Sequence, residues 1–126
     1  MRALIQRVSR SAVYVEGRPL TRIGRGMLIL LGIGKCDTLD NLNFLAKKCT
    51  HLRLFEDKEG KMNHSILEIG GQALIVPQFT LYANTRKGRR PSFSEASPPQ
   101  VAQEFFTRFV KILGNNGVSV HTGIFG

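Results

Sequence analysis

The sequence is poor in the residues from which acid–base and metal sites are usually built. Its 126 residues include nine Asp and Glu, three His and two Cys. His51, His64 and His121 are scattered, and none has a Cys or His neighbour at zinc-ligand spacing. The carboxylates fall mostly in one polar turn and on helix flanks, away from strand ends. We therefore expect no metal site, and the sequence supplies no evident pair of catalytic acid and base.

Long apolar runs, linkers and repeats are also missing. No run reaches the roughly 18 residues that a membrane span needs, so we expect no membrane partner. The N-terminal segment alternates like a strand and does not resemble a signal peptide. Cys36 and Cys49 are therefore expected to be reduced thiols of a cytoplasmic protein. The length and uninterrupted composition predict a single domain over residues 1–126.

Positive charge is what the sequence has in excess. Eighteen Lys and Arg against nine Asp and Glu give a formal net charge of +9. Such a balance favours a polyanionic partner, most often a nucleic acid. The alternative is a cationic surface that only keeps the protein in solution.

Apolar periodicity predicts an α+β fold in which two helices pack on one face of a mixed β-sheet. The expected order of elements is ββ(β)αββαβ. The run MLILLGIG is continuous, which is typical of a strand buried on both faces. Strands are expected at residues 3–8, 11–16, 27–34, 65–69, 73–82 and 118–125. We expect the strands at 65–69 and 73–82 to form a hairpin, with earlier turns at 9–10 and around Gly17 and Pro19.

The two helices are predicted from apolar stripes at spacings of three and four. The first begins after a cap at Asp37 or Thr38 and has Cys49 on its apolar side. The second begins after a cap at Ser97, with Pro98 at its first position, and ends near Gly114.

The segment Gly32-Ile33-Gly34-Lys35 lies between a strand and a helix, where phosphate-binding loops occur. A Walker A motif would need glycine at the position of Ile29 and Ser or Thr at that of Cys36. The third glycine of the dinucleotide-binding fingerprint is missing too. We interpret the segment as a tight turn.

The stretch VPQFTLYANTRKGRRPSF carries the main candidate site. Pro77 cannot donate to a β-ladder, so strand pairing should break there, leaving the N–H groups of Gln78, Phe79 and Thr80 to face a ligand. Such donors stabilise an oxyanion without an ionisable side chain. Thr80 is a candidate nucleophile, but no base stands in the same stretch. It could equally be an ordinary strand residue, and we favour polar positioning over attack.

A basic loop follows directly, with Arg86, Lys87, Arg89 and Arg90 within five positions. Gly88 between them allows the backbone to approach a ligand closely. The loop is either a solvated charge run or a contact for phosphate groups, and its place beside a polar strand end favours phosphate.

Four segments, MRALIQRVSRSAV, LRLFEDKEGKMNHSI, PQFTLYANTRKGRRPSF and TGIFG, resemble D-aminoacyl-tRNA deacylases, in order and along the whole chain. The resemblance implies an enzyme that hydrolyses the ester between a D-amino acid and tRNA, and that also clears mischarged glycine. It implies a cytoplasmic homodimer without a metal or other cofactor. It further implies that the 2′-hydroxyl of the terminal adenosine of the tRNA carries much of the catalysis, which accounts for the missing acid–base pair.

The resemblance assigns the site residue by residue. Gln78, Phe79 and Thr80 match a family motif of the form Ser-Gln-Phe-Thr and are the expected catalytic residues. Pro77 replaces the serine, as in an animal branch associated with L-alanyl-tRNA, although the rest of the chain resembles bacterial members. Arg7 matches a position that supports a Gly-Pro motif across the dimer. That motif lies beyond TGIFG in the family, so we expect the printed chain, which stops at Gly126, to lack it.

The sequence thus predicts a deacylase that edits D-aminoacyl-tRNA, with Pro77, Arg7 and the four cations of the 86–90 loop binding substrate. Three alternatives stay open. They are a non-catalytic tRNA-binding module, a deacylase of L-alanyl-mischarged tRNA, and an editing domain like those fused to archaeal threonyl-tRNA synthetases. The last is disfavoured because no synthetase segment is present.

Overall fold

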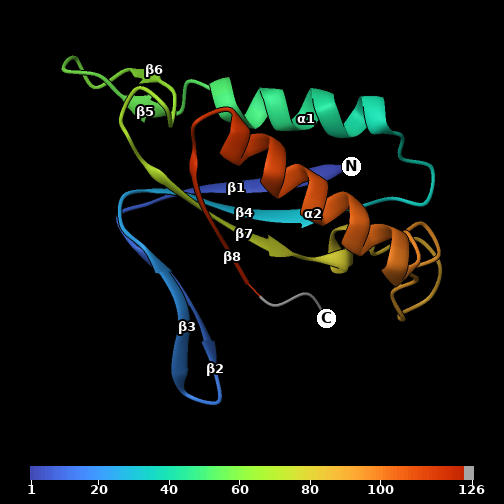
Figure 1. The fold of residues 1–126 in the computed structure, drawn as a ribbon. Helices are drawn as coiled ribbons and strands as arrows, with labels where there is room; N and C mark the ends of the chain where they lie inside the picture. Colours follow the sequence, from blue (N-terminus) through green and yellow to red (C-terminus); the bar gives the residue numbers. More distant parts are fainter. Residues whose placement is uncertain (124–126) are drawn as a thin grey trace.

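A mixed four-stranded sheet forms the centre of the molecule (Figure 1). The computed structural model describes residues 1–123. The strands of the sheet, in spatial order, are β1 (Arg2–Val8), β4 (Gly26–Gly32), β7 (Gln72–Pro77) and β8 (Ser119–Thr122). β1 is antiparallel to β4, whereas β4 pairs in parallel with β7, and β7 with β8. The two central strands therefore end at the same edge of the sheet.

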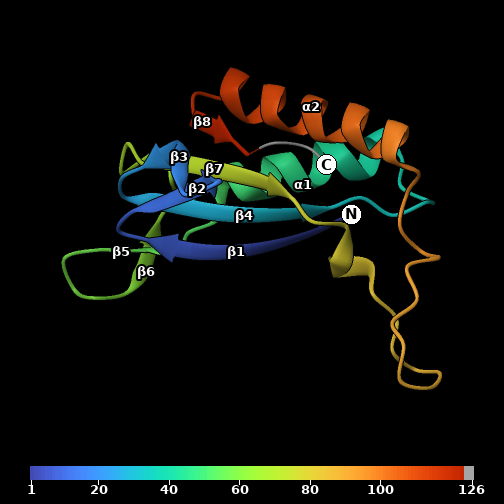
Figure 2. The same cartoon turned by 90° about the horizontal axis from the view of Figure 1, so that it is seen from below.

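Two helices cover one face of this sheet, as expected for an α+β fold (Figures 1 and 2). They are α1 (Leu39–His51) and α2 (Pro99–Asn115). Alternate strand residues, among them Met27, Ile29 and Ile75, are fully buried between sheet and helices. The side chains that the helices bury there are Leu42, Ala46, Cys49, Phe106, Phe109 and Leu113. The predicted fold class and the predicted position of both helices are confirmed.

The cysteines agree with the predicted reduced state. Both are free, Cys36 exposed and Cys49 in the core. Burial raises the pKa of the Cys49 thiol to about 11, so this side chain is a neutral core residue at physiological pH.

The helix starts are fixed by local chemistry. Thr38 caps α1, and its side chain and that of Asn41 bond to each other's backbone N–H in a capping box. The predicted cap of α2 at Ser97 is wrong by one residue, because the helix begins at Pro99 after an extended Pro98. A residue that precedes proline is pushed out of the helical region, so the Pro98-Pro99 pair delays the start.

The predicted strands at 3–8 and 11–16 both form but do not pair with each other. β2 (Ser11–Val15) instead pairs with β3 (Arg18–Ile23), a strand that the sequence reading missed. The turn between them is Glu16-Gly17, whose φ angles of 51° and 77° suit a tight hairpin turn. Pro19 lies within β3 and does not end it, because this two-stranded ribbon leaves edges where a missing N–H is tolerated.

The predicted hairpin of 65–69 with 73–82 is also wrong. Residues 65–70 form turns closed by bonds such as Gly71 N–H to the Ile66 carbonyl. A small hairpin of β5 (Phe55–Glu56) and β6 (Met62–His64) precedes them, around Gly60. β7 pairs with the distant β4 and β8. Of the predicted strand at 118–125, residues 119–122 form β8, and residues 124–125 lie outside the described residues.

The β4 strand is buried completely on one face only. Met27, Ile29 and Leu31 face the helices and are almost fully buried, whereas Leu28 and Leu30 on the opposite face are only half-buried. The prediction of a strand buried on both faces therefore holds for one face within this chain.

Candidate active site

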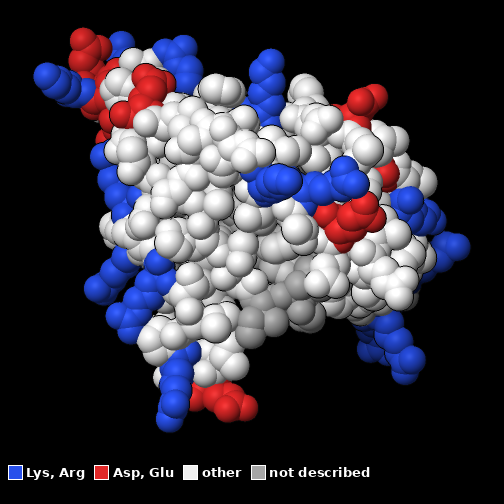
Figure 3. All heavy atoms as spheres, viewed as in Figure 1, with Lys and Arg blue, Asp and Glu red and all other residues white. Residues whose placement is uncertain are grey.

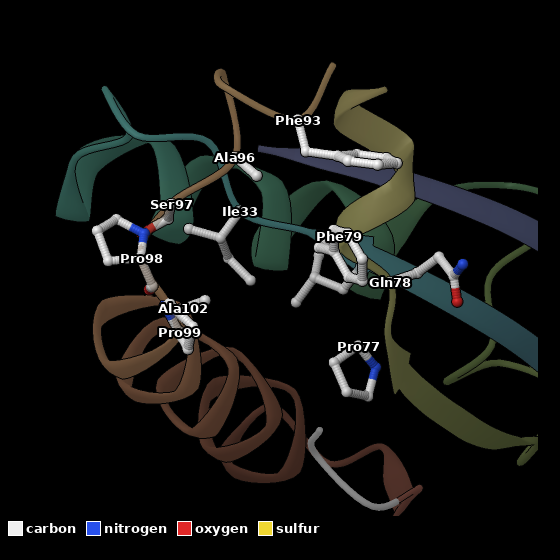
Figure 4. Close-up of a pocket in the computed structure, with 11 residues that line it drawn as sticks. Ile33, Pro77, Gln78, Phe79, Phe93, Ala96, Ser97, Pro98, Pro99 and Ala102 are labelled. Carbon is white, nitrogen blue, oxygen red and sulfur yellow. The ribbon is translucent and has the colours of Figure 1, made fainter. Parts of the chain in front are cut away.

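A pocket of about 550 Å³ opens where β4 and β7 end (Figure 4). Leu31 pairs with Pro77 at this edge, where the β4–β7 pairing ends. The carboxyl ends of parallel strands are the usual position of ligand sites in sheets of this kind. The lining residues are Leu31, Ile33, Pro77, Gln78, Phe79, Phe93, Ala96, Ser97, Pro98, Pro99 and Ala102. The walls are therefore the two strand ends, the 83–98 loop and the first turn of α2.

Two glycines at the end of β4 allow the segment after β7 to pack closely against it. After β7 the chain forms a short 3₁₀ helix, η1 (Phe79–Tyr82), so the predicted strand 73–82 ends at Pro77. A Cβ on Gly34 would stand 2.8 Å from the Tyr82 ring, and one on Gly32 3.0 Å from the Leu81 Cβ. The Gly32–Lys35 segment is thus a close-packed turn against η1, which fits its interpretation as a tight turn.

The backbone donors at the strand end are only partly free. The N–H of Gln78 donates to the Leu31 carbonyl at 2.8 Å, so it prolongs the sheet and does not face a ligand. This corrects one of the three expected donors. Phe79 and Thr80 open a helical turn, where N–H groups have no intrahelical acceptor. Within residues 1–123 neither N–H has a hydrogen-bond partner.

The Thr80 hydroxyl has an amide and not a base beside it. Its Oγ1 accepts a hydrogen bond from the Gln78 Nε2. In the described part of the chain, no His, Asp or Glu hydrogen-bonds to Thr80. The geometry supports a positioning role for Thr80, as the sequence reading favours, because nothing stands ready to remove its proton.

Phe79 is the side chain that defines the pocket. It is 61% exposed and points into the cavity, whereas the Gln78 amide is directed away from it (Figure 4). Phe93, from the 83–98 loop, contacts it edge-to-face with ring centroids 5.0 Å apart. The sequence reading did not single out Phe93, and only its position just after the basic loop could have suggested it.

The 83–98 loop is closed on itself by backbone hydrogen bonds and is attached to the rest of the fold near α2. Asn84 and Ser92 exchange backbone hydrogen bonds of 2.7 and 2.8 Å, which closes the tip of the loop. Nearer α2, the Lys35 N–H donates to the Glu95 carbonyl and the Ser97 N–H to the Ile33 carbonyl, each at 2.9 Å. The pocket wall therefore has backbone support, although the loop has almost no secondary structure.

The four predicted cations lie at the tip of this loop. Arg86, Lys87, Arg89 and Arg90 are exposed, and within residues 1–123 none forms an ion pair. Gly88 between them has a φ of 65°. Figure 3 shows basic side chains projecting at the end of the molecule where Figure 1 places this loop. Among the described residues the tip is thus a positive surface without ion pairs, on the same loop whose Phe93 and Ala96 line the pocket.

Arg7 lies at the other end of the sheet. It pairs with Met27 at the start of β4, while the pocket lies beyond Leu31. Its guanidinium donates to the Leu54 carbonyl at 3.0 Å and stands 3.8 Å from Glu56. Within one chain Arg7 does not line the pocket, so its expected role across a dimer stays a prediction.

Asp37 and Tyr82 form a partly buried polar cluster next to η1. Asp37 accepts hydrogen bonds from the Met1 ammonium at 2.5 Å and from the Gly34 N–H at 2.6 Å. The Tyr82 hydroxyl donates to the same carboxylate at 3.4 Å. Burial, and then the negative charge of Asp37, raise the pKa of Tyr82 to about 12. Tyr82 is thus protonated at neutral pH and holds η1 in place.

The described residues hold no group of three or more His, Cys, Asp or Glu that could bind a metal ion. In residues 1–123, no helix has the length and apolar character to cross a membrane. The site therefore consists of an apolar pocket, a cationic loop and two backbone donors that have no partner in the described part of the chain. This arrangement has the chemistry of a site for an apolar group joined to a polyanion.

Comparison with known proteins agrees with that chemistry. Residues 4–126 match the family described as D-Tyr-tRNA(Tyr) deacylase. A D-aminoacyl-tRNA deacylase of Roseiflexus castenholzii is 54% identical over 126 residues, which cover this whole chain and 80% of the relative. One of Thermosipho africanus is 50% identical over the whole chain and 85% of its own length. This chain belongs to the D-Tyr-tRNA(Tyr) deacylase family.

Two solved structures share the fold. The c-Myc DNA unwinding element binding protein superimposes with a TM-score of 0.94 at 37% identity, over the whole chain and 86% of that protein. A structure described as a probable eukaryotic D-amino acid tRNA deacylase gives a TM-score of 0.77 at 19% identity, over 98% of this chain and 88% of its own. The second likeness supports the fold alone.

Proposed function

We propose that this protein hydrolyses the ester bond of D-aminoacyl-tRNA, including glycine mischarged on tRNA, and so proofreads aminoacyl-tRNA for translation. The family to which it belongs supports the reaction. The observation that carries the proposal within the structure concerns two neighbouring N–H groups, that of Phe79, which lines the apolar pocket, and that of Thr80, which follows it; among residues 1–123 neither has a hydrogen-bond partner. The cationic tip at 86–90 provides for the polyanionic part of the substrate.

The chemistry follows from what the pocket offers. The ester carbonyl oxygen accepts hydrogen bonds from the N–H groups of Phe79 and Thr80, which stabilise the negative charge that develops there. Water adds to the carbonyl carbon, the bond to the ribose oxygen breaks, and that oxygen takes up a proton. The 2′-hydroxyl of the terminal ribose serves the proton transfers, because the described residues bring no acid–base pair to the pocket. The products are free tRNA and the amino acid.

Pro77 bears on which chirality the pocket accepts. It forms part of the wall next to Phe79, where a family serine is replaced. The D-specific reading rests on the similarity of the whole chain to bacterial relatives. Hydrolysis of L-alanyl-mischarged tRNA is the alternative that Pro77 favours.

We further propose that the protein acts as a cytoplasmic homodimer. The sheet face opposite the helices carries apolar side chains that one chain leaves uncovered. Leu4 is 57% exposed, and Leu28 and Leu30 beside it are half-buried. Burial of these side chains against a second copy would stabilise the assembly.

The test is a pair of time courses with protein expressed from its complete reading frame. D-tyrosyl-tRNA and L-tyrosyl-tRNA are incubated with it, and the remaining ester is followed. We expect loss of the D-form and persistence of the L-form. Persistence of both, beside an active control deacylase, would contradict the proposal, and a preference for L-alanyl-tRNA would favour the alternative specificity.

A non-catalytic nucleic-acid-binding role is the second candidate. The uncompensated cations at 86–90 favour it, as does the name of the similar unwinding-element binding protein. Salt-sensitive binding of tRNA without ester hydrolysis would identify this role.

A further inference from the structure

A second, polar pocket of about 430 Å³ lies beside the first. Its lining residues are Arg2, Tyr82, Ala83, Asn84, Thr85, Arg86 and Glu95. The two pockets share two walls. In η1, Phe79 at the start lines the apolar pocket and Tyr82 at the end lines the polar one. In the 83–98 loop, Ala96 lines the apolar pocket and Glu95 the polar one. Three residues of a 3₁₀ helix advance about 6 Å, a length that one nucleotide unit can bridge.

Two contacts position Arg2 in this pocket. Its Nη1 donates to the Leu81 carbonyl at 2.6 Å, and its guanidinium carbon stands 4.4 Å from the centroid of the Tyr82 ring. Tyr82 is in turn bonded to Asp37. The first residue of β1 is thereby fixed at the site end of the sheet, opposite Gly32. A guanidinium fixed in this way loses little further freedom when it binds a ligand.

The charge of the pocket favours an anion. In the described part of the chain, neither Arg2 nor Arg86 has a carboxylate partner. The one carboxylate in the lining, Glu95, is paired with Lys35 at 3.4 Å. Asn84 and Thr85 add neutral polar side chains. Two uncompensated guanidinium groups with polar neighbours match the chemistry of a phosphate group.

We propose that this polar pocket binds a phosphodiester of the acceptor strand of tRNA, with Arg2 as its anchor, while the ester-bearing nucleotide occupies the apolar pocket. The inference rests on the proposed function, since it places the same substrate in two adjoining pockets. It assigns to Arg2 a binding role that is separate from the loop tip. Arg2 binds the phosphate nearest to the reacting ester, and the tip holds phosphates farther along the strand.

The test compares two substrates that differ in phosphate. One is D-tyrosyl-tRNA, and the other is the D-tyrosyl ester of adenosine, which has no phosphodiester. Arg2→Gln removes the charge but can still donate to the Leu81 carbonyl, and Arg2→Lys restores the charge. Arg18→Gln removes the same charge from the β2–β3 hairpin at the far end of the molecule (Figures 1 and 2).

With D-tyrosyl-tRNA, we expect Arg2→Gln to raise KM about 3- to 10-fold with little change in kcat. The slope of log KM against log salt should fall by about one. Arg2→Lys should recover most of the loss, Arg18→Gln should behave as wild type, and all four proteins should treat the adenosine ester alike.

Three results would each be decisive. Equal impairment of Arg2→Gln on both substrates would overturn the proposal by making Arg2 a support of η1. An unchanged KM and salt slope on tRNA would overturn it as well. Failure of the wild-type protein to cleave either ester would instead refute the proposed function. If tRNA without an attached amino acid still bound in a way that depended on Arg2, the phosphate site would stand although the proposed reaction failed.

Discussion

At the scale of single residues, the site depends on backbone groups more than on side chains. Among residues 1–123 the N–H groups of Phe79 and Thr80 have no hydrogen-bond partner, while the Thr80 hydroxyl accepts a hydrogen bond from the Gln78 amide. The sequence led to this stretch because Pro77 should interrupt strand pairing. It could not show that the Gln78 N–H still reaches the Leu31 carbonyl, because that bond depends on the register of a strand more than forty residues away.

We expect Thr80→Ala to retain activity within about an order of magnitude, whereas loss of a nucleophile costs about 10⁴-fold or more. The backbone N–H of residue 80 persists in the variant, and only a contact to Gln78 is lost. Single-turnover hydrolysis of D-tyrosyl-tRNA measures the effect, with Thr80→Ser as the control. Abolished hydrolysis in a folded Thr80→Ala protein that still binds tRNA would indicate a nucleophile.

At the scale of elements, the position of η1 decides the shape of both pockets. It packs against Gly32 and Gly34, and the Tyr82 hydroxyl connects its end to Asp37 by a hydrogen bond. The periodicity of the sequence predicted both helices correctly, because their stripes follow from local spacing. The same periodicity wrongly extended the strand 73–82 through η1. Phe79, Leu81 and Tyr82 are residue types that are common in strands, and tertiary packing makes them helical here.

Gly34→Ala tests the packing beneath η1. The new Cβ would stand 2.8 to 2.9 Å from atoms of the Tyr82 ring, which must move. We expect a loss of about 1 to 3 kcal/mol in the free energy of unfolding, together with a fall in kcat/KM. Gly60→Ala is the control, because its φ of +77° strains an alanine but no atom lies within 4 Å and the pocket is remote. Denaturant unfolding and hydrolysis assays check both variants, and an unaltered Gly34→Ala protein would contradict this packing.

The loop tip is tested by Arg89→Ala combined with Arg90→Ala. Both cations lack ion-pair partners among residues 1–123, so their loss should weaken tRNA binding without unfolding the protein. We expect the slope of log affinity against log salt to fall by about one for each phosphate contact removed. The matched control is Arg18→Ala with Arg22→Ala on β3. Unchanged affinity and slope in the 89/90 variant would remove the tip from the binding surface.

At the scale of the whole molecule, the sequence predicted the features that depend on local pattern and composition. It did not predict which strands pair with each other. The class α+β, both helices and the basic surface follow from local patterns. The pairings of β1 with β4 and of β7 with β4 and β8 join segments far apart in the chain, and nothing local specifies them. The predicted 65–69 hairpin failed for this reason: Ile66 is buried in a turn, so its apolar character gave a false strand signal.

The half-covered sheet face leads to a prediction about assembly. Leu4→Lys places a charge on the face opposite the helices, so it should shift the proposed dimer toward monomer. Phe44→Lys makes the same change at a residue on α1 that is 68% exposed and should leave the dimer intact. Sedimentation equilibrium distinguishes the two. Dissociation by Phe44→Lys but not by Leu4→Lys would place the interface elsewhere.

The central claim concerns the hydrolysis of a D-aminoacyl ester in this pocket. Backbone N–H groups stabilise the developing oxyanion, and the 2′-hydroxyl of the substrate serves the proton transfers. This claim is tested most directly by single-turnover hydrolysis of D-tyrosyl-tRNA that ends either in adenosine or in 2′-deoxyadenosine. Since positioned acid–base groups contribute about 10²- to 10⁴-fold, we expect the deoxy substrate to react at least about a hundredfold more slowly while binding alike. Equal rates on the two substrates, or no hydrolysis of either, would contradict the account.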